Sequence, residues 1–343
     1  MGLVLYGITA YEYWRSSLPR YTPEYGDISA SGLLAACGPT SLRELTGPII
    51  RTEGILDKMH LLVSSPSARR RSKVAEFHCC RAIDALPKGS FYQIGAGIYA
   101  SSPELCFVQL ASELSPLELM RAGTDLCSRY LFSPYDRMET VECEPVTTRK
   151  RLGQFIETMP KWTPGLKRAR RAIRWVLENS RSPRETSLAM VMNLPSRLGG
   201  FQIPGVELNC RISPDETAGL LARRSYFEAD VLLREHKRIL EYESDLYHGG
   251  SQQGSHDYEK IASLQTMGYV VTPITTWQMD SFEALEALLL SVMGSMGMRN
   301  RMGDELSLRR RETHYQIMQD ERRQRELPPI ADMAPWRYLI ARL

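Results

Sequence analysis

Residues 226–248, YFEADVLLREHKRILEYESDLYH, decide how the C-terminal half of the chain folds. Two apolar runs flank the polar stretch REHK, and this pattern is typical of a β-hairpin. If the turn centres on the middle of REHK, Asp230 lies directly opposite Glu241, and directly opposed side chains have Cβ atoms roughly 4.5–5.5 Å apart. Because side chains alternate between the two faces of a strand, Glu243 shares the face of Glu241. The hairpin therefore predicts three carboxylates on one patch of a sheet.

Three carboxylates at such close quarters need something to offset their charge, because like charges directly opposite one another destabilise a sheet. Mg²⁺ or Mn²⁺ would do so, since these hard cations prefer carboxylate oxygens. A neighbouring arginine or lysine, or a raised carboxyl pKa, would do so without a metal. The sequence leaves both hypotheses open, a metal site or a salt-bridged surface. A shift of the register by one residue would remove the cluster altogether.

The stretch SPRET, residues 182–186, predicts the start of a helix. Ser182 is the expected N-cap, Pro183 the first helical residue and Glu185 the third, and together they form a capping box. From these residues alone, capping is the favoured role for Glu185.

Hydrophobic periodicity predicts further elements on both sides of the hairpin. The strand YVVTPITT contains Pro273, which donates no backbone hydrogen bond, so we expect an edge strand or a bulge there. The order helix, strand, strand, helix, strand predicts an α/β fold in which a mixed sheet is flanked by helices, after an α+β N-terminal part. Helices are expected at 165–179, 182–194, 256–268, 281–298 and 303–326.

Two domains are expected for a chain of 343 residues, because a single hydrophobic core rarely grows so large. Three prolines among many basic residues between 145 and 168 favour a boundary in that stretch. The predicted division is an α+β domain at 1–148, a basic linker at 149–164, an α/β domain at 165–280 and a helical extension at 281–343.

Basic residues gather just before the C-terminal half, although the net charge of the whole chain is only +3. Between 149 and 174, nine lysines and arginines face a single acid, Glu157. Such a local excess predicts a polyanionic partner, with DNA first, and its alternative is a solvated helix face. The expected nucleic-acid contacts are Arg149, Lys150, Arg151, Lys167, Arg168, Arg170 and Arg171.

The chain has seven cysteines, an odd number, and it contains no CxxC pair. Both facts argue against a disulfide framework and against a zinc ribbon. Reduced thiols are the simplest interpretation, and they predict a cytoplasmic protein. No run of eighteen apolar residues occurs, so no membrane partner is expected. The chain also lacks a P-loop and a dinucleotide-binding fingerprint.

The ordered set of SPRET, the Asp230 strand, LEYESDLYH at 240–248 and a helix leading into GYVVTPIT resembles the DUF559/Vsr-like branch of the PD-(D/E)XK nuclease superfamily. The resemblance covers about residues 165–280 and implies a restriction-endonuclease-like domain that cleaves DNA with Mg²⁺ or Mn²⁺. It implies metal ligands at Glu185, Asp230 and Glu241, and it matches Glu243 to the second acid of the family's E-x-D pair.

Two departures from the family pattern concern catalysis. Ser244 stands where the family usually has glycine, and Glu243 occupies the place of the superfamily's E-x-K lysine. The resemblance implies that a residue of the next helix can replace that lysine, and Lys260 is the candidate. His248 falls near the family histidine. Taken without the resemblance, Lys260 and His248 are typical of an ordinary surface.

The N-terminal part is similar to AbiEi-type antitoxin proteins in IYASSPELCFVQLA, residues 98–111, and GTDLCSRY, residues 123–130. This similarity implies an abortive-infection context, with a toxin or defence-system partner. Three functions therefore stay open at this point. They are a metal-dependent endonuclease, a non-catalytic DNA-binding antitoxin or repressor with a degenerate nuclease fold, and a protein–protein scaffold built on the charged C-terminal helix.

Overall fold

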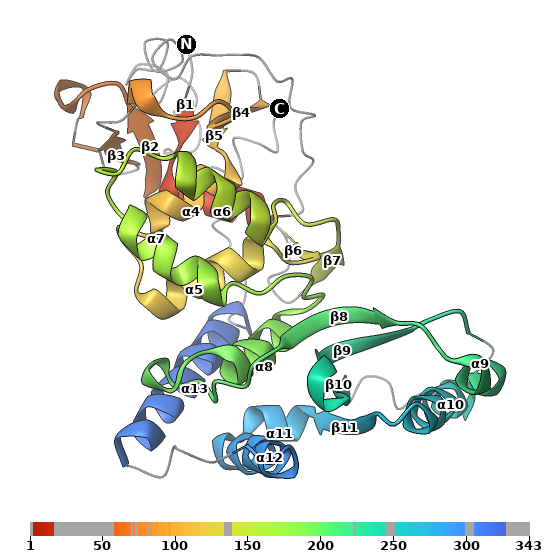
Figure 1. Ribbon diagram of the computed structural model, residues 1–343. Coiled ribbons are helices and arrows are strands. Elements are labelled where there is room, and N and C mark those ends of the chain that lie inside the picture. Colours follow the sequence, from red (N-terminus) through yellow and green to blue (C-terminus); the bar gives the residue numbers. More distant parts are fainter. Residues whose placement is uncertain are drawn as a thin grey trace. The chain divides into compact units, whose positions relative to one another are not determined.

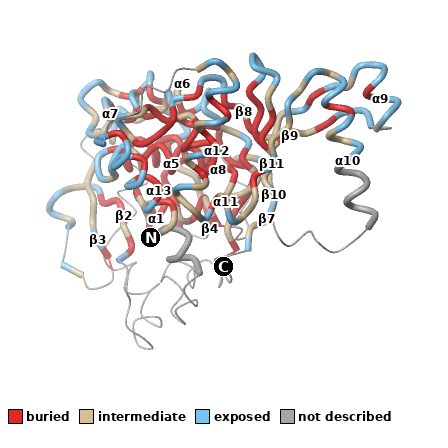
Figure 2. The backbone as a smooth tube through the Cα atoms, turned by 90° about the horizontal axis from the view of Figure 1, so that it is seen from below, coloured by how far each residue is buried: buried red, intermediate tan, exposed pale blue. Residues whose placement is uncertain are grey.

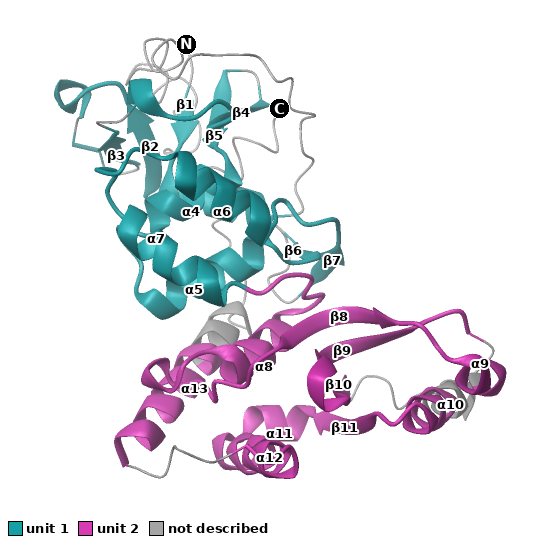
Figure 3. Cartoon of the chain, viewed as in Figure 1, with its two compact units in different colours: residues 1–176, 325–343 teal, residues 177–324 magenta. Residues whose placement is uncertain are grey.

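The computed structural model describes residues 3–16, 58–69, 71–72, 75–80, 83–95, 97–133, 139–222, 224–243, 251–298 and 305–326, the side chains at 222, 251–257 and 320–326 excepted. The chain divides into two compact units (Figure 3). Unit 1 comprises Met1–Val176 with Arg325–Leu343, and unit 2 comprises Leu177–Gln324. Among the described residues, no helix combines the length and the apolar character that crossing a membrane requires.

Unit 1 contains a mixed five-stranded sheet (Figure 1). Its strands are β1 (Leu3–Leu5), β2 (Met59–Val63), β3 (Ala75–Cys79), β4 (Phe91–Gly95) and β5 (Ile98–Ser101), in the order β3-β2-β1-β5-β4. The pairs β1–β5 and β2–β3 are parallel, whereas β1–β2 and β4–β5 are antiparallel. The parallel β2–β3 pair is the part of this sheet on which a candidate site lies.

Helices pack on one another and on the sheet of unit 1, and serine or threonine side chains cap α4, α5 and α6. They are α1 (Gly7–Arg15), α4 (Pro103–Leu110), α5 (Pro116–Leu126), α6 (Arg149–Thr158) and α7 (Leu166–Ala172), with a small hairpin of β6 (Tyr130–Phe132) and β7 (Thr140–Glu142). Every residue of α4 is buried, and α4 packs against α1 and α6. Ser115 and Glu118 form the reciprocal capping box that begins α5, because each side chain bonds the other's backbone N–H.

The basic segment predicted as a linker is instead a packed helix. Thr148 caps α6, and Leu152 and Ile156 on its inner face are buried. Since α6 and α7 pack on the core of unit 1, the units divide after Val176 and not at 149–164. The predicted extension at 281–343 differs as well, because the chain up to Gln324 belongs to unit 2.

Unit 2 is built on a four-stranded mixed sheet. Its elements are α8 (Pro183–Asn193), β8 (Val206–Ile212), α9 (Glu216–Ala222), β9 (Phe227–Leu233), β10 (Arg238–Glu243), α10 (Ser251–Thr266), β11 (Val270–Thr275), α11 (Thr276–Asp280), α12 (Phe282–Ser295) and α13 (Glu305–Glu326). Strands β8, β9 and β10 form an antiparallel meander, and β11 returns parallel to β10 at the edge. Helix α8 packs against β8 and β9, and α10 packs against β11 and α9. The predicted α/β fold with a mixed, helix-flanked sheet is confirmed, and the sequence pattern missed β8 and α9.

The central hairpin has the predicted register. Leu233 pairs with Arg238, and Val231 pairs with Leu240. A single 3-10 turn, Arg234–His236, joins the strands, and Lys237 closes it in the left-handed region with φ 45°. Further 3-10 turns lie at Pro66–Ala68, Ile83–Ala85, Ile173–Trp175 and Ser196–Leu198.

Apolar side chains from β8, β9, β10, α9 and α10 form a hydrophobic core cluster in unit 2, and Figure 2 colours the described residues of these elements by their burial. Phe227, Ala229 and Leu232 of β9 pack there with Ile239 of β10 and Leu264 of α10. Burying a side chain the size of leucine or phenylalanine contributes roughly 1.5–3 kcal/mol, so this packing holds the hairpin in one register. Pro273 lies on the edge strand β11, as its missing N–H predicts.

Candidate active site

Three neighbouring strands bring polar side chains into one row across the sheet of unit 2. Asn209 of β8 lies between the pairs Leu208–Val231 and Cys210–Ala229, and therefore faces Asp230 of β9. On the other side, the hairpin register continued by one residue places Glu241 of β10 opposite Asp230. Asn209 has φ 48°, a left-handed conformation that asparagine tolerates better than most residues and that recurs at functional sites.

The hairpin ladder ends at this row, and a side chain replaces a missing backbone bond. The Tyr242 backbone N–H donates to Oδ2 of Asp230 at 2.9 Å. Burial raises the pKa of Asp230. Burial, and next the negative charge of Asp230, raise the pKa of Glu241 to about 7. The two carboxylates thus share one confined place, as the sequence predicted.

Lys260 of α10 reaches Glu241 from the next helix. Its Nζ lies 2.7 Å from Oε2 of Glu241, and less than a fifth of either side chain is exposed. The other oxygen of that carboxylate, Oε1, is buried and has no hydrogen-bond partner. A buried polar atom without a partner costs roughly 1–3 kcal/mol, and more when it is charged. Glu241 therefore has one oxygen held by Lys260 and one buried oxygen that lacks a donor.

Glu185 lies near Asp230, but its oxygens serve the start of its own helix. Oε1 accepts from the Ser182 hydroxyl at 2.9 Å, and Oε2 accepts from the Arg181 backbone N–H at 2.9 Å. Asn209 Nδ2 donates to the same Oε2 at 2.6 Å, and the Glu185 N–H donates to Ser182 Oγ. Burial raises the pKa of Glu185, and the charge of Asp230 raises it further. Glu185 thus ties the start of α8 to the row. Ser182 is the N-cap as predicted, but the Glu185 side chain bonds the Arg181 N–H and the Ser182 hydroxyl and not the Ser182 N–H, so the reciprocal capping box is not formed.

Glu228, two residues before Asp230 on β9, shows what full charge pairing does to a carboxylate in this sheet. Arg181 forms two hydrogen bonds with it, at 2.6 and 3.1 Å, and Arg211 lies 3.4 Å away. These guanidinium groups, Arg181 first, lower the pKa of Glu228. The pKa values of Asp230 and Glu241 are raised even though Lys260 attracts both. Pairing with arginine therefore dominates the pKa of Glu228, whereas burial dominates the pKa values of Asp230 and Glu241 in spite of Lys260.

The remaining predicted residues of the site are spread more widely. Glu243 is exposed at the end of β10, and His248 lies outside the described residues. Over the side chains that the structure describes, Glu185, Asp230 and Glu241 do not form a group of three ligand atoms within 4.8 Å of one another. The pair Asp230 and Glu241 is thus the candidate ligand set, and one or two carboxylates are the usual protein contribution to a Mg²⁺ site.

The predicted nucleic-acid contacts on α6 and α7 divide into two groups. Arg149, Lys150, Lys167 and Arg171 are exposed. Arg151, which is also exposed, pairs with Glu104 at 3.1 Å, Arg170 pairs with Glu157 at 3.4 Å, and Arg168 donates to the carbonyl of Leu114. The basic excess available to a polyanion is therefore smaller than the sequence suggests.

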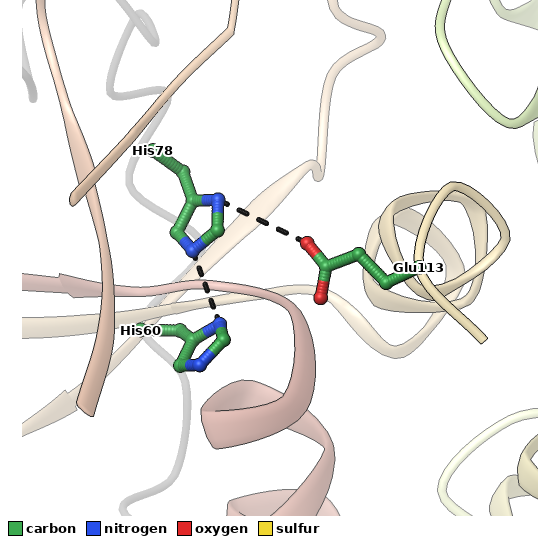
Figure 4. A group of neighbouring side chains, drawn as sticks. All are labelled: His60, His78 and Glu113. Atoms are coloured by element: carbon green, nitrogen blue, oxygen red, sulfur yellow. Dashed lines mark hydrogen bonds and ion pairs between the residues drawn. The ribbon is translucent and has the colours of Figure 1, made fainter. Parts of the chain in front are cut away.

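A second cluster, which the sequence pattern missed, lies in unit 1. Figure 4 shows the side chains of His60, His78 and Glu113 pointing toward one another from β2, β3 and the turn after α4. Burial, and next the neighbouring His60, lower the pKa of His78 to about 4. Burial raises the pKa of Glu113. The signal in the sequence was weak, because His60 and His78 stand one each in two short strands, MHLLV and AEFHC, far from Glu113 in the chain.

Comparison with known proteins does not bear on either cluster. No family model, no curated protein and no solved structure matches the chain. The similarity to PD-(D/E)XK nucleases and to AbiEi-type proteins accordingly stays a prediction from the sequence motifs.

Proposed function

We propose that unit 2 is a divalent-metal-dependent DNA endonuclease of the PD-(D/E)XK type, with a role in phage defence. The observation that carries the proposal is the arrangement at Glu241: Asp230 opposite it, Lys260 on one carboxylate oxygen, and the other oxygen buried without a partner. Two opposed carboxylates and one lysine are the residue types that metal-assisted phosphodiester hydrolysis needs.

The order of the strands and helices in unit 2 also supports the proposal. Unit 2 runs α8, β8, β9, β10, α10, β11, with a three-stranded meander followed by a helix and a parallel return strand. The acidic residues lie on the two central strands, β9 and β10, and the lysine lies on the helix that follows them. This is the order in which the resemblance distributes the metal ligands and the replacement lysine.

Asp230 and Glu241 fit a Mg²⁺ or Mn²⁺ ion. Both supply carboxylate oxygens, and their negative charges repel each other. Oε1 of Glu241 is a buried acceptor that lacks a donor. A bound cation would polarise a phosphoryl oxygen and lower the pKa of a water molecule. Lys260 keeps a positive charge beside Glu241, where it would stabilise negative charge on a phosphate. Glu185 holds Asn209 and the start of α8 in place and is a positioning residue in this proposal.

The test is cleavage of supercoiled plasmid by the full-length protein with Mn²⁺, with Mg²⁺ and with a chelator. Asp230→Asn and Glu241→Gln keep the side-chain shape and remove the charge, so cleavage should fall about 100-fold or more. Glu235→Gln is the matched control, because Glu235 is exposed in the turn of the same hairpin. Its cleavage should equal that of the wild type. An inactive wild type, or equal cleavage by all four proteins, would reject the proposal.

A second candidate, a DNA-binding antitoxin or repressor that does not cut, is favoured by the exposed bases Lys150, Lys167 and Arg171. DNA affinity should then fall steeply with salt and need no metal. Changing all three to glutamine should lower the slope of log affinity against log salt by roughly 2–3, since each phosphate contact contributes about 0.9. An affinity that does not respond to salt would exclude this candidate.

A further inference from the structure

The His60–His78–Glu113 cluster is assembled from three separate segments of unit 1. In the parallel pair β2–β3, Leu62 is the register partner of His78, so His60 and His78 lie two positions apart on the same face. Glu113 follows α4 and brings its carboxylate to the same place (Figure 4). The N-terminal strand and helix pin His60 there, since the His60 N–H donates to Thr9 Oγ1 and the Tyr6 N–H donates to the His60 carbonyl, both at 2.9 Å.

The two imidazoles lie within hydrogen-bond distance of each other, and the distances within the cluster also fit ligands of one ion. His78 Nε2 and His60 Nδ1 are 3.0 Å apart, and one ligand atom from each of the three residues lies within 4.8 Å of the others. Two nitrogen ligands on a tetrahedral zinc ion are roughly 3.3 Å apart, given metal–nitrogen bonds of about 2.0–2.1 Å. His78 Nδ1 lies 3.9 Å from Glu113 Oε1, too far for a hydrogen bond. The carboxylate thus approaches the imidazoles without bonding His78 directly.

The imidazole rings are held in place and remain reachable from solvent. Tyr6 stacks on His78 with ring centroids 4.3 Å apart, and His60 also stacks on His78, with ring centroids 4.9 Å apart. The side chains of His78 and Glu113 are 17% and 34% exposed, so an ion has a path to the cluster. Fixed ligand orientation and an open path are what a metal site requires.

We propose that His60, His78 and Glu113 form a binding site for a divalent transition metal of the zinc type. Two imidazoles and one carboxylate select zinc, cobalt or nickel over Mg²⁺ and Ca²⁺, which prefer oxygen ligands throughout. Three protein ligands leave a fourth position for water or a substrate, as in catalytic zinc sites. This site differs in ligand chemistry from the carboxylate pair of unit 2 and does not depend on the proposed nuclease activity.

The experiment is cobalt titration of the tag-free, reduced full-length protein, followed by its visible absorption. Binding should give the intense d–d bands of a four-coordinate ion with no sulfur-to-cobalt charge-transfer band, because none of the three ligands is a thiol. Zn²⁺ should displace the cobalt, and Mg²⁺ in large excess should not. His60→Gln, His78→Gln and Glu113→Gln should each weaken cobalt binding at least about tenfold.

His236→Gln is the matched control, because His236 is exposed in the hairpin turn of unit 2. It should bind cobalt like the wild type, and so should Asp230→Asn, which separates this site from the proposed active site. Thermal melting of each metal-free variant establishes that it is folded. The site is rejected if folded wild-type protein gives no d–d bands, if a charge-transfer band shows cysteine ligation, or if the three variants bind as the wild type does.

Discussion

Lys260 Nζ lies 2.7 Å from one oxygen of Glu241, while the other oxygen of the same carboxylate is buried without a hydrogen-bond partner. The two residues come from a strand and a helix separated by 19 positions in the chain. One lysine thus offsets part of the negative charge that Asp230 and Glu241 create together.

Replacing Lys260 should separate catalysis from metal binding. Lys260→Met removes the cation that competes with a metal for Glu241, so Mn²⁺ affinity measured by calorimetry should not fall. Plasmid cleavage should fall at least about tenfold, because the charge that stabilises the phosphate is lost. Lys260→Arg keeps the charge and should restore part of the activity. Loss of Mn²⁺ binding in Lys260→Met, or unchanged cleavage, would contradict the role assigned to Lys260.

The metal-free protein should lose stability as the pH rises through neutrality. The pKa of Glu241 is raised to about 7 in the folded chain, so its contribution is fully present below the ordinary glutamate pKa. The contribution is lost as the pH rises through the folded value, and the loss is on the order of 1–3 kcal/mol. Thermal melting with a chelator at about pH 5.5 and about pH 8 measures it.

Glu241→Gln is the control for this pH dependence, because an amide does not titrate. The raised pKa values of Asp230 and Glu185 act in the same direction, so the variant should keep a smaller dependence. Mn²⁺ should raise the melting temperature of the wild type more at the higher pH. A melting temperature that increases with pH over this range would show that Glu241 is not held in the arrangement described.

Glu185 should behave as a positioning residue. Glu185→Gln keeps the length of the side chain and one carbonyl acceptor, and its cleavage should stay within about tenfold of the wild type, unlike Asp230→Asn. Glu185→Ala leaves the Arg181 N–H without its acceptor and removes one of the two acceptors of the Asn209 amide, which keeps the Asn179 carbonyl, and it should cost about 1–3 kcal/mol of unfolding free energy. If cleavage by Glu185→Gln falls as far as that of Asp230→Asn, Glu185 is a metal ligand.

Two glycines in helices of unit 1 should respond in opposite ways to alanine. A Cβ at Gly123 of α5 would lie 2.6 Å from Val176 and 2.8 Å from Phe107, so Gly123→Ala should destabilise the protein by about 1–3 kcal/mol through overpacking. A Cβ at Gly153 of α6 would meet nothing within 4 Å. Gly153→Ala should therefore stabilise by about 0.5–1 kcal/mol through helix propensity. Urea unfolding of both variants measures the contrast, and equal effects would contradict the packing of α5.

Features encoded in contiguous residues were predictable. The apolar runs on either side of the polar REHK turn predicted the register of the hairpin. That register places Asp230 opposite Glu241. Serine, proline and glutamate in sequence gave the starts of α5 and α8, and the missing N–H of Pro273 gave the edge strand. Each of these depends on backbone geometry within a few residues, which is why the amino-acid sequence alone determined it.

Packing between distant segments decided the rest. Local pattern did not reveal that α6 joins the core of unit 1, that β8 sets Asn209 beside Asp230 and Glu185, or that His60 and His78 meet Glu113. The sequence offered Lys260 as one polar residue among many on a helix, and only the path of α10 across the sheet brought it to Glu241. Such contacts depend on the summed burial of many side chains, a property of the whole fold that no short stretch of sequence carries.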